Sequence, residues 1–334
     1  MTFRFAFADF KSTFLNQKKL NQDTINNVGQ LNELVNQKME YNDFLSHLKQ
    51  WQGPQNFQIH NSRFGFYLFF AVVALILGVT IYPYLVLLTF AFVIYAFIQR
   101  QSPTAYQHML IRLEEFTLSQ KYQLQFETTE SLTHLPQLQH FPLFKLGNDE
   151  NEILNSAYGV WRIQGSNYPF KIFNYHYVDR IERRDAEGKK KVEYEHHDLW
   201  GIQMFQIPLQ GISISRYQKR ACRLGVKWES IDIQFNQRYQ QSGTNEMLLA
   251  KFFSPSHILK LDQALQAYSG DLYIHPDYPS LVWLFKQDIL KRQPDLEDIR
   301  TINDLAYHLE QLSMPEFEHF QSIATSLFEE ILHR

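Results

Sequence analysis

The feature that most constrains this chain is residues 64–99, a window of thirty-six residues that contains no Asp, Glu, Lys, Arg or His. The whole chain of 334 residues is 20% charged, so its apolar residues are concentrated in one place. As a single straight helix the window would be about 54 Å long, whereas the hydrocarbon core of a bilayer is about 30 Å thick. The window is therefore too long for one upright membrane span and has room for two short ones.

Pro83 lies near the middle of this window. Proline removes a hydrogen bond from a helix interior and disfavours helix at the residue before it. The sequence therefore predicts a hairpin of two membrane-spanning helices, 64–81 and 84–98. A single kinked span is one alternative. A buried helical pair in a soluble core is the other, and it is disfavoured because so long a charge-free stretch is rare in such cores.

The charges that flank the window predict its orientation. Lys49 and Arg63 precede it, Arg100 and Arg112 follow it, and the turn carries no charge. Because cytoplasmic loops are enriched in Lys and Arg, we expect both termini in the cytoplasm and a multi-pass protein of the cell inner membrane. Residues 1–14 lack the continuous apolar core of a signal peptide, so we expect the hairpin itself to direct insertion.

Charge and cysteine content exclude several classes of protein. Cys222 is the single cysteine of the sequence, so it forms neither an internal disulfide nor a thiolate metal site alone, and we expect a buried thiol in a reducing compartment. Basic neighbours that lower its pKa are the alternative. The net charge of −3 argues against nucleic acid as a partner. Residues 1–63 carry +2 and residues 101–334 carry −6, so the larger soluble part is acidic.

The segments on either side of the hairpin are predicted to be helical at both ends of the chain. Residues 1–63 form an N-terminal cytoplasmic segment with an amphipathic helix at 23–51, whose other face is rich in Asn and Gln. Residues 100–140 form a helical connector that extends the second span. Residues 293–334 form two C-terminal helices. The apolar helix faces could pack on the protein's own domain, pair with a second copy or lie on the membrane.

Residues 141–292 are predicted to form an α+β soluble domain. Short segments rich in aromatic and β-branched residues alternate with turn signals such as Gly165 and Gly211. Successive strands joined by short turns favour a mainly antiparallel sheet with flanking helices. We expect strands at 158–163, 169–181, 191–207, 212–215, 230–235 and 272–275, and helices at 255–268 and 280–291.

Several short segments carry a resemblance to a known family. They are FKLG at 144–147, NSAYG at 155–159, FKIFNYHY at 170–177, FQIPL at 205–209, FNQRY at 235–239, FFSP at 252–255 and GDLYI at 270–274. With the hairpin, their order resembles a family of uncharacterised bacterial membrane proteins of unknown function. In that family two transmembrane helices precede an α+β soluble domain. The resemblance implies this layout and implies no activity.

The sequence contains no phosphate-binding loop, dinucleotide fingerprint, nucleophile elbow or His-Glu-x-x-His motif, and no cofactor is expected. The densest polar cluster is at 193–198. Alternation along a strand would place Glu195 and His197 on one face, and His176 could join them across a hairpin. These three residues are the candidates for a catalytic or metal-binding site. A solvent-exposed end of a hairpin without metal is the expected alternative.

The turn between the strands at 169–181 and 191–207 holds a second candidate site. It carries six basic and four acidic residues within 179–191. Clustered cations near an anionic leaflet are attracted to it, so a peripheral lipid sensor is one hypothesis. Its candidate lipid-contact residues are Arg180, Arg183, Arg184, Lys189, Lys190 and Lys191.

These observations lead to one functional hypothesis and two alternatives. We expect a membrane-anchored, non-catalytic interaction or scaffolding module on the cytoplasmic face. Its partners would be the lipid bilayer and either another protein or a second copy, bound through the amphipathic helices. The alternatives are a membrane-surface enzyme or metal-binding domain with a site near His176, Glu195 and His197, and the lipid sensor.

Overall fold

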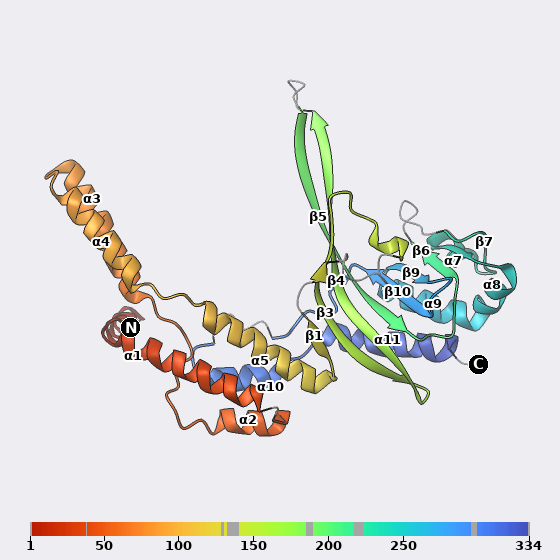
Figure 1. The fold of residues 1–334 in the computed structure, drawn as a ribbon, viewed down its shortest axis with the longest axis horizontal. Helices are drawn as coiled ribbons and strands as arrows, with labels where there is room; N and C mark the ends of the chain where they lie inside the picture. Colours follow the sequence, from red (N-terminus) through yellow and green to blue (C-terminus); the bar gives the residue numbers. More distant parts are fainter. Residues whose placement is uncertain are drawn as a thin grey trace. The chain divides into compact units, whose positions relative to one another are not determined.

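The computed structural model describes residues 2–37, 39–127, 130–131, 140–184, 190–216, 223–294 and 299–332, with residues 2–12 and 130–131 described by backbone alone. The chain forms two compact units, drawn in Figure 1. The first comprises Met1–Gln120 and Pro294–Leu312, and the second comprises Lys121–Gln293 and Ser313–Arg334. Each unit is thus formed by two separate stretches of the chain.

The first unit is helical. C-terminal residues return to pack on its N-terminal part: Lys49 Nζ lies 2.7 Å from Glu310 Oε1, and the Tyr41 hydroxyl donates to the Leu309 carbonyl at 3.3 Å. A capping box between Thr301 and Asp304 fixes the start of the returning helix. The helices are α1 (Thr2–Asn36), α2 (Tyr41–Lys49), α3 (Ser62–Thr80), α4 (Leu85–Gln99), α5 (Thr104–Tyr122) and α10 (Ile302–Gln311).

Helix α1 differs from the helix predicted at 23–51. The helix ends at Asn36 and a new helix begins at Tyr41, so the predicted element is two helices. Four polar side chains of α1 are buried. Their exposed fractions are 3% or less: Gln17, Asn21, Thr24 and Asn27.

These buried side chains bind the backbone of the segment at 54–63. Asn27 Nδ2 donates to the carbonyls of Pro54 and Asn56, both at 2.8 Å. Asn21 and His60 form a reciprocal pair, since Asn21 Nδ2 donates to the His60 carbonyl at 2.9 Å and accepts from the His60 amide at 2.8 Å. An extended segment has backbone groups that no helix satisfies, so polar rather than apolar side chains hold it.

Helices α3 and α4 form the predicted hairpin. Ser62–Thr80 and the run Leu85–Tyr122 are the described stretches long and apolar enough to cross a membrane. The second run includes α4 and α5, but the backbone at Arg100 is extended (ψ 129°), so the apolar helix ends at Gln99 and does not continue as the connector. At about 1.5 Å per residue the two helices are about 28 Å and about 22 Å long.

The base of the hairpin is fastened by side-chain amides. Asn61 Nδ2 donates to the Gln101 carbonyl at 3.0 Å, and the Gln101 amide donates back to Asn61 Oδ1 at 2.9 Å. Gln17 of α1 accepts from the Ser62 hydroxyl and from the Arg63 amide through Oε1. Asn61 and Gln101 are thereby bonded to each other, and the start of α3 is bonded to α1.

The second unit is built on one antiparallel sheet, as predicted. Its strand order is β1-β3-β4-β5-β10-β9-β6-β8-β7, and β2 also pairs with β3. The strands are β1 (Gln125–Glu127), β2 (Glu130–Ser131), β3 (Glu150–Ile163), β4 (Ser166–Arg184), β5 (Lys190–Phe205), β6 (Ile212–Ser215), β7 (Val226–Trp228), β8 (Gln240–Gly243), β9 (Gly270–Ile274) and β10 (Ser280–Phe285).

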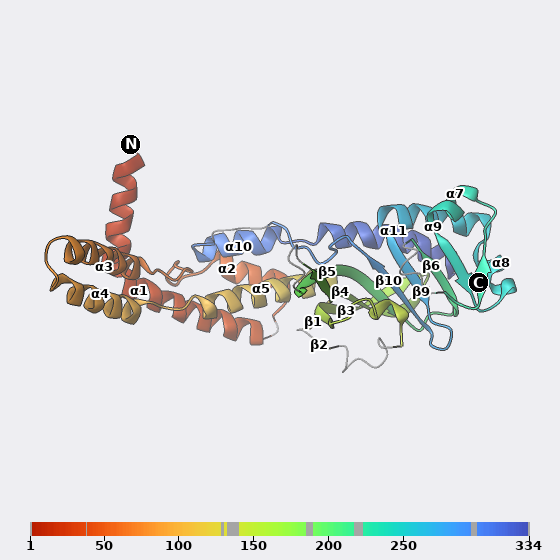
Figure 2. The ribbon, with the colours of Figure 1, turned by 90° about the horizontal axis from the view of Figure 1, so that it is seen from above.

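The two faces of this sheet are covered differently. Helices α9 (Pro255–Ala267) and α11 (Pro315–Ile331) lie along one face, as Figure 2 shows, and we call it the helix face. There Trp283 packs against Phe320 with ring centroids 5.4 Å apart. The short helix η2 (Pro142–Phe144) and its neighbour Phe141 cover the centre of the other face, which we call the η2 face.

Two elements of the second unit differ from the prediction. Residues 230–235 alternate like a strand, but Ile231 and Ile233 are 79% and 71% exposed, and Asp232 caps helix α7 (Ile233–Arg238) by accepting from the Phe235 amide. Residues 280–291 were expected to be a helix and instead begin with strand β10. A short apolar run buried on both faces does not distinguish strand from helix by periodicity. The remaining helix, α8 (Glu246–Phe252), follows β8.

Candidate functional site

The structure separates the three residues predicted to form a catalytic or metal-binding site. In the antiparallel pair of β4 and β5, His176 lies opposite Asp198, and Tyr177 lies opposite His197. Neighbouring residues of a strand point to opposite faces. His176 is therefore on one face of the β4–β5 ribbon, and Glu195 and His197 are on the other.

His176 has its own partners. Its Nδ1 lies 3.0 Å from Asp198 Oδ1 and its Nε2 lies 3.2 Å from His196 Nδ1. The His176 and His196 rings are also stacked, with centroids 5.4 Å apart. Both ring nitrogens of His176 are thus occupied by protein groups, as for a polar residue that is satisfied within a sheet.

On the opposite face of the ribbon, Glu195 and His197 belong to a chain of ion pairs. Arg183 contacts Glu195 at 3.1 Å, and His197 lies 3.7 Å from Asp179. The His197 ring stacks on Tyr177 at 4.7 Å. In the part of the chain that the structure describes, no three His, Cys, Asp or Glu side chains are grouped so that they could hold a metal ion.

Most of the described lipid-contact candidates are paired with carboxylates. Arg180 and Lys190 both contact Glu182, at 3.7 Å and 3.3 Å, and Lys191 contacts Glu193 at 3.0 Å. The adjacent Lys191 ammonium lowers the pKa of the Glu193 carboxyl. Arg183 contacts both Glu193 and Glu195, and Arg184 is exposed at the end of β4. Lys189 and Cys222 lie outside the described residues.

A row of mostly polar side chains crosses the η2 face from strand to strand. Three of its members, Lys171, Gln203 and Ser213, are 2% exposed or less. Buried polar groups on a sheet face require partners or a ligand, so this row marks where a site can lie. The row consists of Tyr158, Lys171, Gln203, Val282, Tyr273, Ser213, Ser242 and Lys227.

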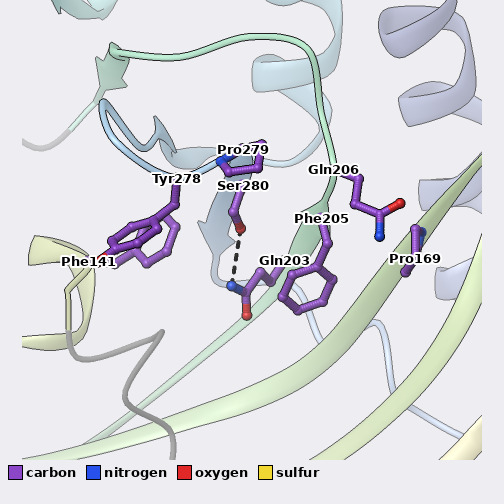
Figure 3. A pocket seen from close by; sticks show the side chains of 8 residues that line it. All are labelled: Phe141, Pro169, Gln203, Phe205, Gln206, Tyr278, Pro279 and Ser280. Atoms are coloured by element: carbon purple, nitrogen blue, oxygen red, sulfur yellow. Dashed lines mark hydrogen bonds between the residues drawn. The ribbon is translucent and has the colours of Figure 1, made fainter.

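A cavity of about 410 Å³ opens on this face beside Gln203. Figure 3 shows Phe141 and Tyr278 on one side of the Gln203–Ser280 pair, and Phe205, Gln206 and Pro169 on the other. Pro279 completes the lining. Among the residues that the structure describes, the lining contains no carboxylate, ammonium, guanidinium, imidazole or thiol.

Hydrogen bonds fix the orientation of the amide at the floor of this cavity. The Ser280 hydroxyl donates to the Met204 carbonyl at 2.9 Å, so its proton is used. Its oxygen accepts from Gln203 at 3.1 Å, which requires that Nε2, and not Oε1, faces Ser280. Gln203 Oε1 is then left as an acceptor; it is not among the fully buried polar atoms that lack a partner, so it is open to the cavity that Gln203 lines.

His275 holds the side of the cavity that Phe141 and Tyr278 form. Its Nδ1 accepts from the amides of Asp277 and Tyr278, at 3.0 Å and 3.1 Å, which fixes the turn that carries Tyr278. Its ring lies 5.1 Å from Phe141 and 4.6 Å from Tyr278. Burial lowers the pKa of this imidazole, so it stays neutral and keeps accepting.

A search of the sequence for titratable groups could not find this cavity, because its polar groups are neutral. The available signal was Gln203, a polar residue between Ile202 and Met204 in a strand whose neighbours are apolar.

Comparison of the chain with protein families, with curated proteins and with solved structures found no match.

Proposed function

We propose that this chain is a membrane-anchored, non-catalytic interaction module of the bacterial inner membrane, with both termini in the cytoplasm. The observation that carries the proposal is the apolar surface of the α3–α4 hairpin. Val79, Tyr84 and Leu87 are 76%, 83% and 70% exposed, and they are the most exposed of the many large hydrophobic residues on the hairpin's outer surface. A contiguous apolar surface of this kind marks a membrane or protein contact.

A non-catalytic role is supported by the cavity on the η2 face. Acid–base and nucleophilic catalysis need a titratable group, or a nucleophile beside a base. Among the described lining residues the phenol of Tyr278 is the one titratable group, and the Ser280 hydroxyl donates to a carbonyl with no carboxylate, imidazole or amine among these residues to act as its base. The cavity is therefore suited to binding, and the separation of His176 from Glu195 and His197 also favours binding over catalysis.

The β4–β5 ribbon is the surface that best suits a protein partner. Figure 1 shows the two strands projecting beyond the rest of the sheet. Within the described residues, β4 pairs with β3 only as far as Val178, and β5 pairs with β10 only from Trp200. Free strand edges can accept a further strand. The apolar side of α11, by contrast, is buried on its own sheet.

Membrane anchoring is tested by extraction of cell membranes at alkaline pH. We expect the wild-type chain to remain with the lipid. A Val72→Arg, Phe90→Arg double variant should be released, because these exposed positions lie near the middle of α3 and α4, where each arginine costs about 2.5–3.5 kcal/mol. Leu259→Arg, on the exposed side of α9, is the control and should remain. Recovery of the wild-type chain in the soluble fraction would refute anchoring.

The interaction is tested by photo-crosslinking in native membranes. A photoreactive residue in place of Tyr194, which is 55% exposed on the ribbon, should give an adduct of defined larger mass. The same residue in place of Tyr307, which is 60% exposed on α10, is the control. Monomer alone at both positions would count against an interaction module.

A further inference from the structure

We propose that the cavity lined by Phe141, Phe205, Tyr278 and Gln203 binds a neutral, planar heteroaromatic molecule that donates an N–H to Gln203 Oε1. This proposal rests on the proposed function, because it names the small ligand of the same non-catalytic module. The cavity has a volume of about 410 Å³, which suits a molecule of one or two fused rings. Ligand cavities in proteins usually hold about 300–1,000 Å³.

The described residues of the cavity lining carry no ionised group, and this sets the charge of the ligand. A charged ligand would lose its hydration without gaining an ion pair from any of the eight lining residues. Five of the eight described lining residues are aromatic or proline. Such a lining favours an uncharged molecule with a large apolar area.

The arrangement of the rings sets the shape of the ligand. Phe141 and Tyr278 stand on one side of the floor and Phe205 on the other, as Figure 3 shows. Aromatic rings pair best in offset-stacked or edge-to-face geometry, so a flat ring between these two sides is favoured over a branched aliphatic group. His275 contacts both Phe141 and Tyr278, so that side of the cavity is organised before a ligand arrives.

The floor of the cavity determines which hydrogen bond a ligand can make. Because Ser280 fixes the direction of the Gln203 amide, the group presented to a ligand is the carbonyl oxygen Oε1. An acceptor that is open to the cavity can bind water while the cavity is empty, and a ligand that displaces this water without donating an N–H would leave the acceptor unpaired. A ring nitrogen that bears hydrogen is therefore preferred to the same ring without it.

Two probes that differ at one nitrogen test this proposal: benzimidazole, which has an N–H donor, and 1-methylbenzimidazole, which has none. Binding of each to the full chain in lipid nanodiscs is measured by saturation-transfer NMR titration. We expect the wild-type chain to bind benzimidazole about tenfold more tightly than the methylated probe, as for one hydrogen bond. Gln203→Met keeps the size of the side chain and should bring the two affinities within about twofold.

A second variant separates cavity binding from uptake of the probes by lipid. Phe205→Ala removes one side of the cavity at a half-buried position, so we expect it to fold and to weaken both probes by at least about fivefold. Leu259→Ala is the control and should match the wild type. Equal binding by the wild type and Phe205→Ala, or a preference for benzimidazole that survives in Gln203→Met, would overturn the proposal. Neither result would affect anchoring or crosslinking, which test the proposed function separately.

Discussion

His275 is a buried imidazole that works only in its neutral form. Protonation of Nδ1 would replace an acceptor of two amide hydrogens by a donor. The pKa of His275 is lowered from 6.5, mainly by burial, while Asp277 opposes the shift. The stabilisation that this residue contributes is thus complete above about pH 6.5 and is lost as the pH falls from there through the lower folded-state pKa.

We therefore predict that His275→Asn reduces the dependence of stability on pH. The Asn Oδ1 can accept the same amide hydrogens and does not titrate. The thermal midpoint should fall more for the wild type than for the variant between about pH 7.5 and about pH 5.5. Parallel midpoint curves for the two proteins would show that His275 does not titrate in this range.

Asn27 has a comparable structural role in the first unit. Its amide donates to two backbone carbonyls, so Asn27→Ala removes both hydrogen bonds; the Pro54 carbonyl keeps the Trp51 indole N–H as a donor at 3.2 Å, whereas the Asn56 carbonyl loses its donor. We predict a loss of about 1–3 kcal/mol of stability, measured by thermal unfolding in detergent. Asn26→Ala, one residue earlier on the exposed side of α1, should change stability by less than about 0.5 kcal/mol. Equal effects of the two substitutions would contradict the structural role assigned to the buried Asn27 side chain.

Among elements, the α3–α4 hairpin contains two glycines with opposite expected behaviour. A Cβ added to Gly78 would lie 2.9 Å from both the backbone nitrogen and Cγ2 of Val86, whereas at Gly65 nothing lies within 4 Å. We predict that Gly78→Ala destabilises the helix pair by about 1–3 kcal/mol through this clash. Gly65→Ala should be neutral or stabilise α3 by up to about 1 kcal/mol. Thermal unfolding in detergent distinguishes the two, and a loss of equal size at both positions would contradict the close approach at Gly78.

Elements with a clear period or composition were predictable from the sequence. The hairpin helices begin and end within two residues of the prediction, and Ile212–Ser215 is a strand with the predicted bounds. The polar side of α1 was not predictable, because burial of Asn27 depends on a segment twenty-seven residues away in the sequence. Strand β10 was missed because its partners, β5 and β9, decide its conformation.

The cavity could not be predicted from the sequence either, because it also depends on contacts between segments that are distant in the chain. Gln203 and Ser280 come from strands β5 and β10, and their hydrogen bond depends on a register that no local pattern reveals. Phe141 lies outside the strands altogether. The alternation along 193–198 was predicted, however, and the same alternation places Glu195 and His197 on one face, away from His176.

At the scale of the whole molecule, the second unit is discontinuous in the chain. Its helix α11 follows residues Pro294–Leu312, which belong to the first unit. Phe320 and Phe328 of α11 pack on Trp283 and Trp161 of the helix face. The predicted soluble domain at 141–292 therefore lacks a helix that covers its sheet.

We predict that truncation of the chain after Leu312 prevents the second unit from folding. The milder substitution Phe320→Ala should cost about 3–5 kcal/mol, because it empties a fully buried aromatic site. Protease resistance of the β3–β5 region measures both effects. A truncated chain whose sheet is as resistant as the wild type would show that α11 is dispensable.

The uncharged turn of the hairpin bears on how the chain would insert into a membrane. Ile81, Tyr82, Pro83 and Tyr84 carry no charge, and the nearest charged residues are Arg63 and Arg100 at the base. Insertion from the cytoplasm would then move no ion through the hydrocarbon, so the step is a partition of an apolar helix pair and not the transport of a polar segment. In the proposed membrane-anchored state, the two arginines would set the depth at which entry stops.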